Sequence, residues 1–186
     1  MKNLNISTVT TAKRVGVFSL SNKKNKKWEI TWMKGLGEIL KDKSGRVYLI
    51  VVNGVIYKIG GSVDKKGILG TMSWYENNAL SGAPSTRTHG IHMLVYDELK
   101  KGNNVEVYMI LSNKVEAPVK GLFGEKTMMV SIDFKEMENL CKSDYFSKCD
   151  KYPKWNFQEN NEQWPIELVE SCNQVNNQSA ANRKRK

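Results

Sequence analysis

The strongest constraint on the fold lies in residues 46–60, where two apolar, β-branched runs are separated by Asn53-Gly54. Asn-Gly between two such runs is typical of a tight β-hairpin turn. In the first run, Val47 to Val52, apolar side chains occupy both faces of the strand, so this strand should lie centrally and be covered on both sides. We therefore expect the core to form around this hairpin.

The remaining segments predict a small antiparallel sheet flanked by helices, which is an α+β fold. A chain of 186 residues, 40% of them hydrophobic, has enough apolar material for one core. Apolar spacing and glycine or proline breaks predict helices over 28–41, 71–80, 86–101 and 134–149, a strand over 105–111, and a second hairpin over 122–132.

Both ends of the chain are polar. Residues 1–27 are rich in Thr, Ser, Asn and Lys and suggest an arm or a recognition hairpin, and the tail from about Val175 to Lys186 is expected to be disordered. The predicted organisation is a basic N-terminal arm and helix over 1–43, a main domain over 44–158, and a C-terminal extension with a basic tail over 159–186.

The positive charge is unevenly placed. The chain has a formal net charge of +10, and residues 1–66 contain 14 Lys and Arg against 4 Asp and Glu. Such a block suits a polyanion, with nucleic acid as the first candidate and an acidic membrane surface as the second, or it is simply a well-solvated lysine-rich surface. The cluster before Trp28 would supply sequence-independent phosphate contacts through Lys23, Lys24, Lys26 and Lys27.

The cysteines and histidines argue against a disulfide framework and against zinc. Cys141, Cys149 and Cys172 are odd in number and lack CxxC spacing, and no residues are evidently placed to complete a site with His89 and His92. No apolar run reaches the roughly 18 residues that a membrane helix needs, and no signal peptide is evident. We expect reduced thiols and a cytoplasmic protein without a membrane segment.

A family resemblance starts in the hairpin. Val47-Tyr48 followed by Lys58-Ile59-Gly60 resembles the opening of the GIY-YIG nucleases, in particular the short restriction-endonuclease branch whose second motif reads KIG. Five further matches follow in the family's order, between residues 44 and 158: Ser62, Trp74-Tyr75, Leu122-Phe-Gly-x-Lys-Thr127, Lys135-x-x-Glu138-Asn139 and Pro153-x-x-Asn156.

The resemblance implies roles for four residues. Tyr48 would be the general base, Lys58 would supply the positive charge that favours its phenolate, and Tyr75 would position the nucleophile or the phosphate. Glu138 would hold one Mg²⁺ (or Mn²⁺), because this metal typically uses one or two carboxylates plus water and phosphate. Tyr57 is expected to be structural.

One family residue is missing. The family carries an arginine on the first helix, whereas residues 64–73 here contain none. Either Lys65, Lys66 or the more distant Arg87 takes its place at the phosphate, or the site is impaired. Arg87 also precedes a predicted helix, capped by Thr86 or Thr88, whose N-terminus favours anions.

The mechanism requires a particular hairpin register. A simple two-residue turn at Asn53-Gly54 would place Tyr48 and Lys58 on opposite faces of the sheet. A three-residue loop with a bulge at Gly54 would place them directly opposite one another on one face. The catalytic hypothesis therefore predicts the bulged loop.

The function expected from the resemblance is a Mg²⁺-dependent endonuclease acting on double-stranded DNA, of the restriction or phage and mobile-element type, in a bacterial or phage-infected cell. It would be a homodimer if it cuts both strands of a palindrome. The alternatives are a catalytically impaired DNA-binding protein of the same fold, supported by the missing arginine, and a basic structural protein whose resemblance is accidental.

Overall fold

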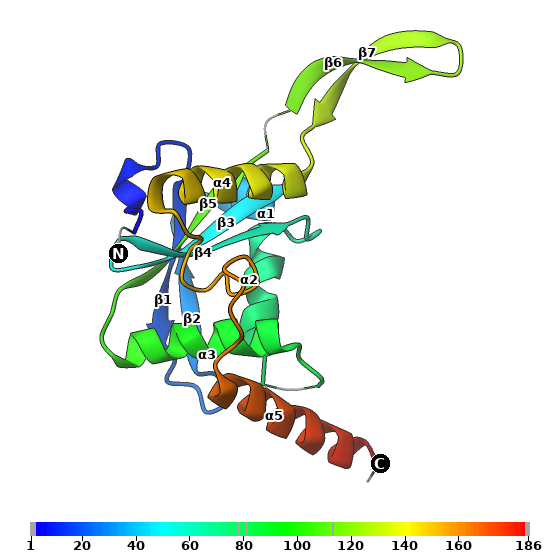
Figure 1. Ribbon diagram of the computed structural model, residues 1–186. Helices are drawn as coiled ribbons and strands as arrows, with labels where there is room; N and C mark the ends of the chain where they lie inside the picture. The colour runs from blue at the N-terminus through cyan, green and yellow to red at the C-terminus, as the bar shows by residue number, and fades with distance from the viewer. Residues whose placement is uncertain (1–2, 78, 81, 113, 185–186) are drawn as a thin grey trace.

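The hairpin predicted from residues 46–60 forms part of a five-stranded antiparallel sheet with the strand order β2-β1-β5-β3-β4. The computed structural model describes residues 3–77, 79–80, 82–112 and 114–184 (Figure 1). In chain order, the elements are η1 (Ile6–Thr8), β1 (Lys13–Leu20), β2 (Trp28–Trp32), α1 (Gly37–Lys41), β3 (Arg46–Val52), β4 (Val55–Ser62), α2 (Gly67–Asn77), α3 (Thr86–Lys100), β5 (Val105–Leu111), β6 (Lys114–Gly121), β7 (Gly124–Ser131), α4 (Phe134–Cys149) and α5 (Ile166–Lys184).

Strand β3 lies between β4 and β5, and all seven of its residues are buried, as the sequence predicted. Because side chains alternate along a strand, Tyr48 and Ile50 pack with residues of α2 and α3, whereas Val47 and Leu49 pack with residues of α4. The sheet is therefore sandwiched between α2 and α3 on one face and α4 on the other (Figure 1). The predicted α+β fold is confirmed.

The N-terminal segment departs from the prediction. Residues 13–20 and 28–32 are strands β1 and β2, which pair as a hairpin within the sheet, so the predicted alternative of a hairpin holds in part, whereas the helix predicted from residue 28 does not form over 28–32. Trp28 is buried against Phe18, with ring centroids 5.2 Å apart, and its indole N–H donates to the His92 carbonyl. Residues 28–32 also fit the period of a strand, and pairing with β1 decided between the two patterns. Helix α1 covers only five residues of the predicted helix.

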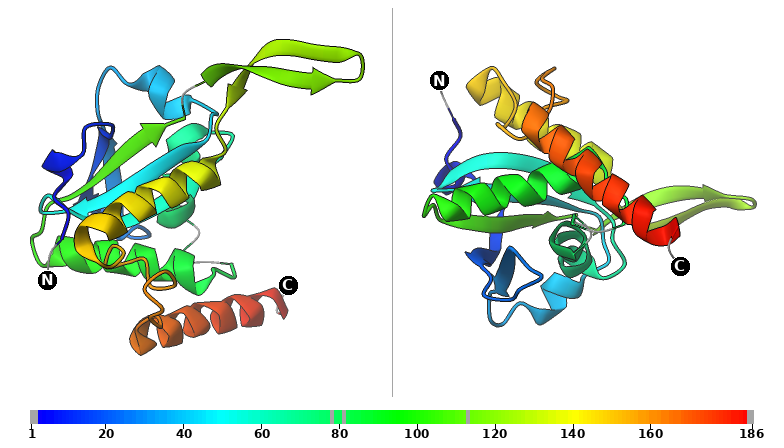
Figure 2. Two further views of the ribbon diagram at one scale, coloured as in Figure 1. Left: turned by 45° about the horizontal axis from the view of Figure 1, so that its top comes forward. Right: turned by 90° about the horizontal axis from the view of Figure 1, so that it is seen from below.

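Residues 175–184 of the predicted disordered tail are helical, contrary to the prediction, and residues 185–186 lie outside the described residues. Helix α5 runs to Lys184, and its first half lies against α3 (Figures 1 and 2). Leu168 and Cys172 are buried there, and Ser171 hydrogen-bonds to the His89 ring. The amphipathic contact with α3 stabilises a helix that the polar composition does not indicate. None of the helices described is long and apolar enough to cross a membrane.

The second hairpin is longer than the prediction over 122–132. Its strands β6 and β7 pair from Lys114 and Ser131 to the turn at Leu122-Phe123, so the glycine at 124 begins a strand rather than the turn. Figure 2 shows this hairpin extending away from the rest of the molecule.

The segment that follows α4 returns to the free edge of the sheet and fixes β4. The side chain of Asn156, fully buried, accepts from the Ile59 N–H at 2.9 Å and donates to the Ile59 carbonyl at 3.1 Å. The backbone N–H of Trp155 donates to the Tyr57 carbonyl at 2.7 Å. The edge strand that contains the family motif is thus held by hydrogen bonds from a distant segment.

We predict that Asn156→Asp lowers the free energy of unfolding by about 2–3 kcal/mol, because a carboxylate cannot donate to the Ile59 carbonyl and two acceptors then face each other in a buried site. Urea denaturation measures the change. The matched control is Asn139→Asp on the exposed surface of α4, with an expected change below about 0.5 kcal/mol. Equal stabilities of the two variants would contradict the role assigned to Asn156.

Candidate active site

The register of the β3–β4 hairpin differs from the one we predicted. Asn53 and Gly54 form a two-residue turn with φ of 48° and 80°, and Tyr48 pairs with Gly60 rather than with Lys58. A bulge further along adds Tyr57 to β4, so that Lys58 pairs with Ile50. Since Ile50 is two residues from Tyr48, Lys58 and Tyr48 still share one face of the sheet. The predicted three-residue loop is wrong, but the bulge has the same consequence.

Tyr48 forms a buried pair with Tyr75 of α2. Their hydroxyl oxygens are 2.7 Å apart, and Tyr48 is 1% exposed. The His92 ring donates from Nδ1 to the Tyr75 carbonyl at 2.9 Å and so fixes the last turns of α2. Burial, and then the neighbouring Tyr75, raise the pKa of Tyr48 well above its usual value, and the charge of Arg87 only partly opposes them.

Arg87 provides the positive charge that faces this pair. It lies in the first turn of α3, which is capped by Ser85, whose side chain accepts from the Thr88 N–H, and not by Thr86 or Thr88 as predicted. Burial alone lowers the pKa of Arg87, but its interactions with Tyr48 and Tyr75, including a hydrogen bond to Tyr48, raise it above the usual value. Arg87, rather than Lys58, is therefore the positive charge that lowers the pKa of Tyr48.

Lys58 is 4% exposed. Burial and the charge of Arg87 lower its pKa to about 7, against the opposing attraction of Glu159. Near neutral pH, the Lys58 ammonium is therefore only partly charged. The charge of Lys58 therefore changes with pH near neutrality, whereas Arg87 stays fully charged there.

The two glycines after Lys58 make room for the side chains of the site. A Cβ at Gly60 would collide with the ring and hydroxyl of Tyr48, and a Cβ at Gly61 would lie 2.6 Å from Glu138 Oε2. Tyr48 and Glu138 therefore approach the edge strand from opposite faces and meet it at adjacent residues. This gives the Gly-Gly pair a physical role that the motif alone does not explain.

Glu138, on α4, belongs to a charged cluster. The Lys142 ammonium lies 2.7 Å from Glu138 Oε1 and 2.5 Å from Glu159 Oε1. Burial opposes ionisation of Glu159, but hydrogen bonding from Lys142 outweighs it and lowers the pKa of Glu159 to about 2. The sequence analysis missed Lys142 and Glu159, although the spacing of Glu138 and Lys142 is typical of a helical ion pair.

Two connected pockets lie beside the tyrosine pair. A pocket of about 290 Å³ contains Tyr48, Tyr75, Gly61 and Arg87 in its wall. A larger pocket of about 890 Å³ shares Asp64 and Trp74 with it. The larger pocket is lined by four lysines, two of which the sequence analysis had named: Lys41, Lys43, Lys65 and Lys66. The predicted residues Lys65 and Lys66 thus lie next to the tyrosine pocket rather than in it.

The N-terminal lysines are engaged within the chain. Lys23 pairs with Glu29 at 3.1 Å, Lys26 pairs with Glu76 at 2.9 Å, and the Lys27 ammonium lies 4.5 Å from the Tyr96 ring centre. These contacts partly neutralise the cluster. Lys24, in the same loop, is exposed.

Other predicted features lie outside the site. The stretch Leu122–Thr127 is at the end of the projecting β6–β7 hairpin. His89 and His92 bind separate backbone carbonyls, those of Ala79 and Tyr75, as expected for structural histidines. Within the described residues, no cluster of three or more His, Cys, Asp or Glu side chains could hold a metal ion.

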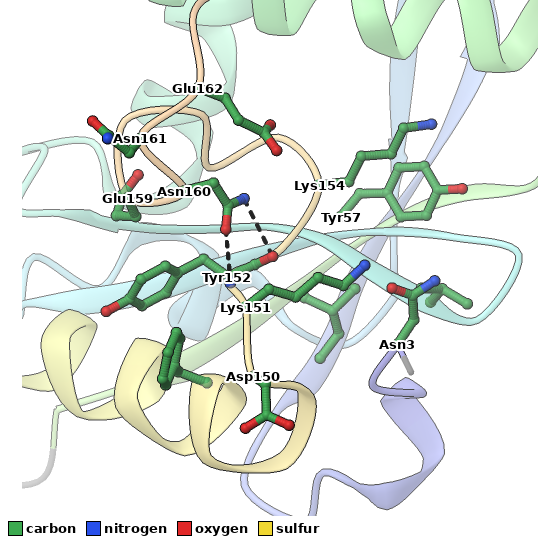
Figure 3. Close-up of a pocket in the computed structure, with 13 residues that line it drawn as sticks. Asn3, Tyr57, Asp150, Lys151, Tyr152, Lys154, Glu159, Asn160, Asn161 and Glu162 are labelled. Atoms are coloured by element: carbon green, nitrogen blue, oxygen red, sulfur yellow. Dashed lines mark hydrogen bonds between the residues drawn. The ribbon is translucent and has the colours of Figure 1, made fainter. Parts of the chain in front are cut away.

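A third pocket, of about 610 Å³, lies between the end of α4 and the loop over residues 150–162 (Figure 3). Asn160 spans the base of this loop, accepting from the Tyr152 N–H at 2.9 Å and donating to the Pro153 carbonyl at 3.2 Å. Glu159 lines this pocket, but Tyr48, Arg87 and Glu138 do not. Its polar groups hold the loop that carries Asn156 and Glu159.

We predict that Lys58→Met removes part of the pH dependence of stability. Between pH 7 and 10.5 the unfolded chain keeps the lysine proton and the folded chain does not, so the stability of the wild type rises with pH, at most about 1.4 kcal/mol per pH unit from this group. The variant should gain most stability at pH 6. Urea denaturation between pH 6 and 9 checks this, with Lys120→Met on the exposed hairpin as the control. An unchanged slope in Lys58→Met would contradict it.

Comparison with known proteins adds the following. No protein-family model and no curated protein matches the chain. Among solved structures, a mutant of bacteriophage T4 EndoII is 16% identical, with a TM-score of 0.50, and the match covers 81% of this chain and 95% of that chain. The restriction endonuclease HPY188I in complex with product DNA is 22% identical, with a TM-score of 0.45, over 82% of this chain and 85% of that one. The chain therefore has a fold similar to that of phage EndoII.

Proposed function

We propose that this chain is a metal-dependent endonuclease that hydrolyses phosphodiester bonds in double-stranded DNA. The observation that carries the proposal is the convergence of Tyr48 from β3, Tyr75 from α2 and Arg87 from α3 on one pocket, with Glu138 behind Gly61. The resemblance to the GIY-YIG motifs and the fold shared with the phage endonuclease support it. Phosphodiester hydrolysis needs a base for water and positive charge at phosphorus, and these groups supply both.

Tyr48 is the proposed general base. Its raised pKa makes it a neutral phenol in the resting protein, so it must lose a proton before it can accept one from water. Arg87 favours that loss, since its guanidinium stabilises the phenolate by charge, whereas burial and the neighbouring Tyr75 oppose it. Burial excludes water from the phenolate and thereby strengthens its attraction to the Arg87 guanidinium.

Arg87 is the proposed replacement for the arginine that residues 64–73 lack. It reaches the pocket from α3 rather than α2, and its guanidinium remains exposed to the pocket and to solvent. A guanidinium can bind two phosphate oxygens at once, which an ammonium cannot do. This supports an active site over an impaired one.

Glu138 is the proposed metal ligand, and its surroundings fit Mg²⁺ or Mn²⁺. Lys142 engages Oε1, while Oε2 lies over Gly61, one residue from the strand position opposite Tyr48. A single carboxylate completed by water and phosphate oxygens is an ordinary magnesium environment. When bound, the metal would supply positive charge for the leaving oxygen. Lys142 would hold the carboxylate in place through Oε1.

The lysine-lined pocket is the proposed path of the DNA backbone. Lys65 and Lys66 are exposed at its wall, and it adjoins the tyrosine pocket through Asp64 and Trp74. Exposed ammonium groups give sequence-independent phosphate contacts. Trp74, 58% exposed, offers an aromatic face beside them.

We predict that Tyr48→Phe lowers the rate of Mg²⁺-dependent plasmid cleavage by about 10²–10⁴-fold, because it removes the base. Arg87→Lys should lower the rate by about 10²-fold through loss of the guanidinium fork. Glu138→Gln should abolish the metal-dependent cleavage, because it removes the proposed metal ligand. The matched control is Tyr57→Phe, whose ring packs on Trp155, with an expected effect below about twofold. Single-turnover assays on plasmid measure the rates.

The same assays test the alternative function. A wild type that binds duplex DNA with a steep salt dependence, but cleaves no sequence with Mg²⁺ or Mn²⁺, would be the catalytically impaired DNA-binding protein. A wild type that neither binds nor cleaves duplex DNA would instead support the third alternative, a basic structural protein. Equal cleavage by Tyr48→Phe and Tyr57→Phe would refute the role of Tyr48.

We further predict that the cleavage rate rises with pH, up to about tenfold per unit between pH 6 and 9. The pKa of Tyr48 is raised, so the active phenolate is a minor species throughout this range and its fraction grows with pH. Single-turnover rates at saturating metal measure the profile. A break near pH 7 that disappears in Lys58→Met would instead assign the limiting ionisation to Lys58.

A further inference from the structure

The hairpin of β6 and β7 has two chemically different faces. Residues paired across an antiparallel ribbon share a face, and side chains alternate along each strand. Val115 pairs with Val130, and Met128 pairs with Ala117, on one face. We call this the apolar face, and it comprises Val115, Ala117, Val119, Met128 and Val130, with Lys126 opposite Val119 at the end nearest the turn. The opposite face carries the pairs Glu116 with Met129, Pro118 with Thr127, and Lys120 with Glu125.

The apolar face has no cover within the described chain. The hairpin extends away from the sheet and its helices in every view of the ribbon (Figures 1 and 2). All residues of β6 and β7 are exposed except Ala117, Val119 and Val130, which are half-buried. At the turn, Leu122 and Phe123 are 95% and 101% exposed. A lone two-stranded ribbon is marginally stable in water, and soluble monomers rarely expose contiguous apolar surface of this kind.

We propose that the apolar face, together with the Leu122-Phe123 turn, binds the same surface of a second copy of this chain. A twofold axis places identical patches against each other, and apart from Lys126 near the turn this face consists of valine, alanine and methionine, which are complementary to the same side chains of a second copy. The hairpin carries three lysines and two glutamates, in contrast to the excess of positive charge in residues 1–66. Its charge therefore does not favour DNA as the occupant.

The area is sufficient for a specific dimer. The larger apolar side chains are those of Val115, Val119, Leu122, Phe123, Met128 and Val130, and they can bury roughly 100 Å² each on average, most of it from the fully exposed Leu122 and Phe123. Two facing hairpins would then bury about 1,200 Å² in total, at the lower end of specific interfaces. Most of that area would be apolar, as in homodimer interfaces.

Such a dimer would have two copies of the Tyr48 pocket. One chain provides one such pocket among its described residues, and cleavage of both strands of a duplex requires two reaction centres or two binding events. The hairpins lie outside the layers that form each pocket, so they could join two domains without covering either pocket (Figure 1). Self-association is measured without cleavage, so its failure is distinguishable from failure of the nuclease activity.

The test compares two neighbouring methionines with nearly equal exposure on opposite faces of the hairpin. Met128 is 53% exposed on the apolar face, and Met129 is 56% exposed on the other. We expect the wild type to be a dimer in sedimentation equilibrium at micromolar concentrations. Met128→Lys should raise the dimer dissociation constant at least about 30-fold, because it places a charge in the interface of both copies, and Met129→Lys should raise it less than about threefold.

Circular dichroism and thermal unfolding check that both variants keep the fold. Hydrogen exchange of the wild type at two concentrations gives a measurement that needs no variant, and amides of residues 114–131 should be better protected at the higher one. A monomeric wild type, or equal dimer constants for the two variants, would overturn the proposal. So would protection of the hairpin only on addition of duplex DNA, which would assign the apolar face to DNA.

Discussion

The candidate site depends on the close approach of two side chains to the edge strand β4. Tyr48 reaches Gly60 from the face covered by α2 and α3, and Glu138 reaches Gly61 from the face covered by α4. Only adjacent residues without side chains allow a phenol and a carboxylate from opposite faces to meet one strand. The side-chain amide of Asn156 and the backbone N–H of Trp155 hold this strand from its open side. The fold thereby brings together groups from four separate segments.

The electrostatics of the site divide between one permanent and one variable charge. Arg87 acts on Tyr48 and Tyr75 and stays charged at any relevant pH, whereas burial leaves Lys58 close to half-charged near pH 7. A tyrosine acting as the proposed general base would need the permanent charge, which Arg87 provides from α3. The carboxylates of Glu138 and Glu159 are held by Lys142 and surround Lys58 with compensating charge. Positive charge in the site is therefore set by burial as much as by residue type.

The elements outside this core serve other needs. The lysines between β1 and β2 are largely used in contacts within the chain, so the net charge of the first third overstates what is available to a ligand. The lysines near α2 line an open pocket and remain accessible. The β6–β7 hairpin carries apolar residues where a solvated loop would carry polar ones. The proposed DNA path and the proposed dimer surface would use these two features separately.

The sequence by itself determined the central hairpin, the buried strand β3, helices α3 and α4, and the identity of Tyr48, Tyr75, Glu138 and Arg87 as candidates, because these depend on local periodicity, turn residues and short motifs. Only the tertiary structure decided three further points. Residues 28–32 joined the sheet because β1 offered a partner, residues 175–184 are helical because they continue a helix whose first half packs on α3, and Arg87 rather than Lys58 lowers the pKa of Tyr48. Pairing, burial and charge contacts between distant segments are long-range interactions, and no local pattern specifies them.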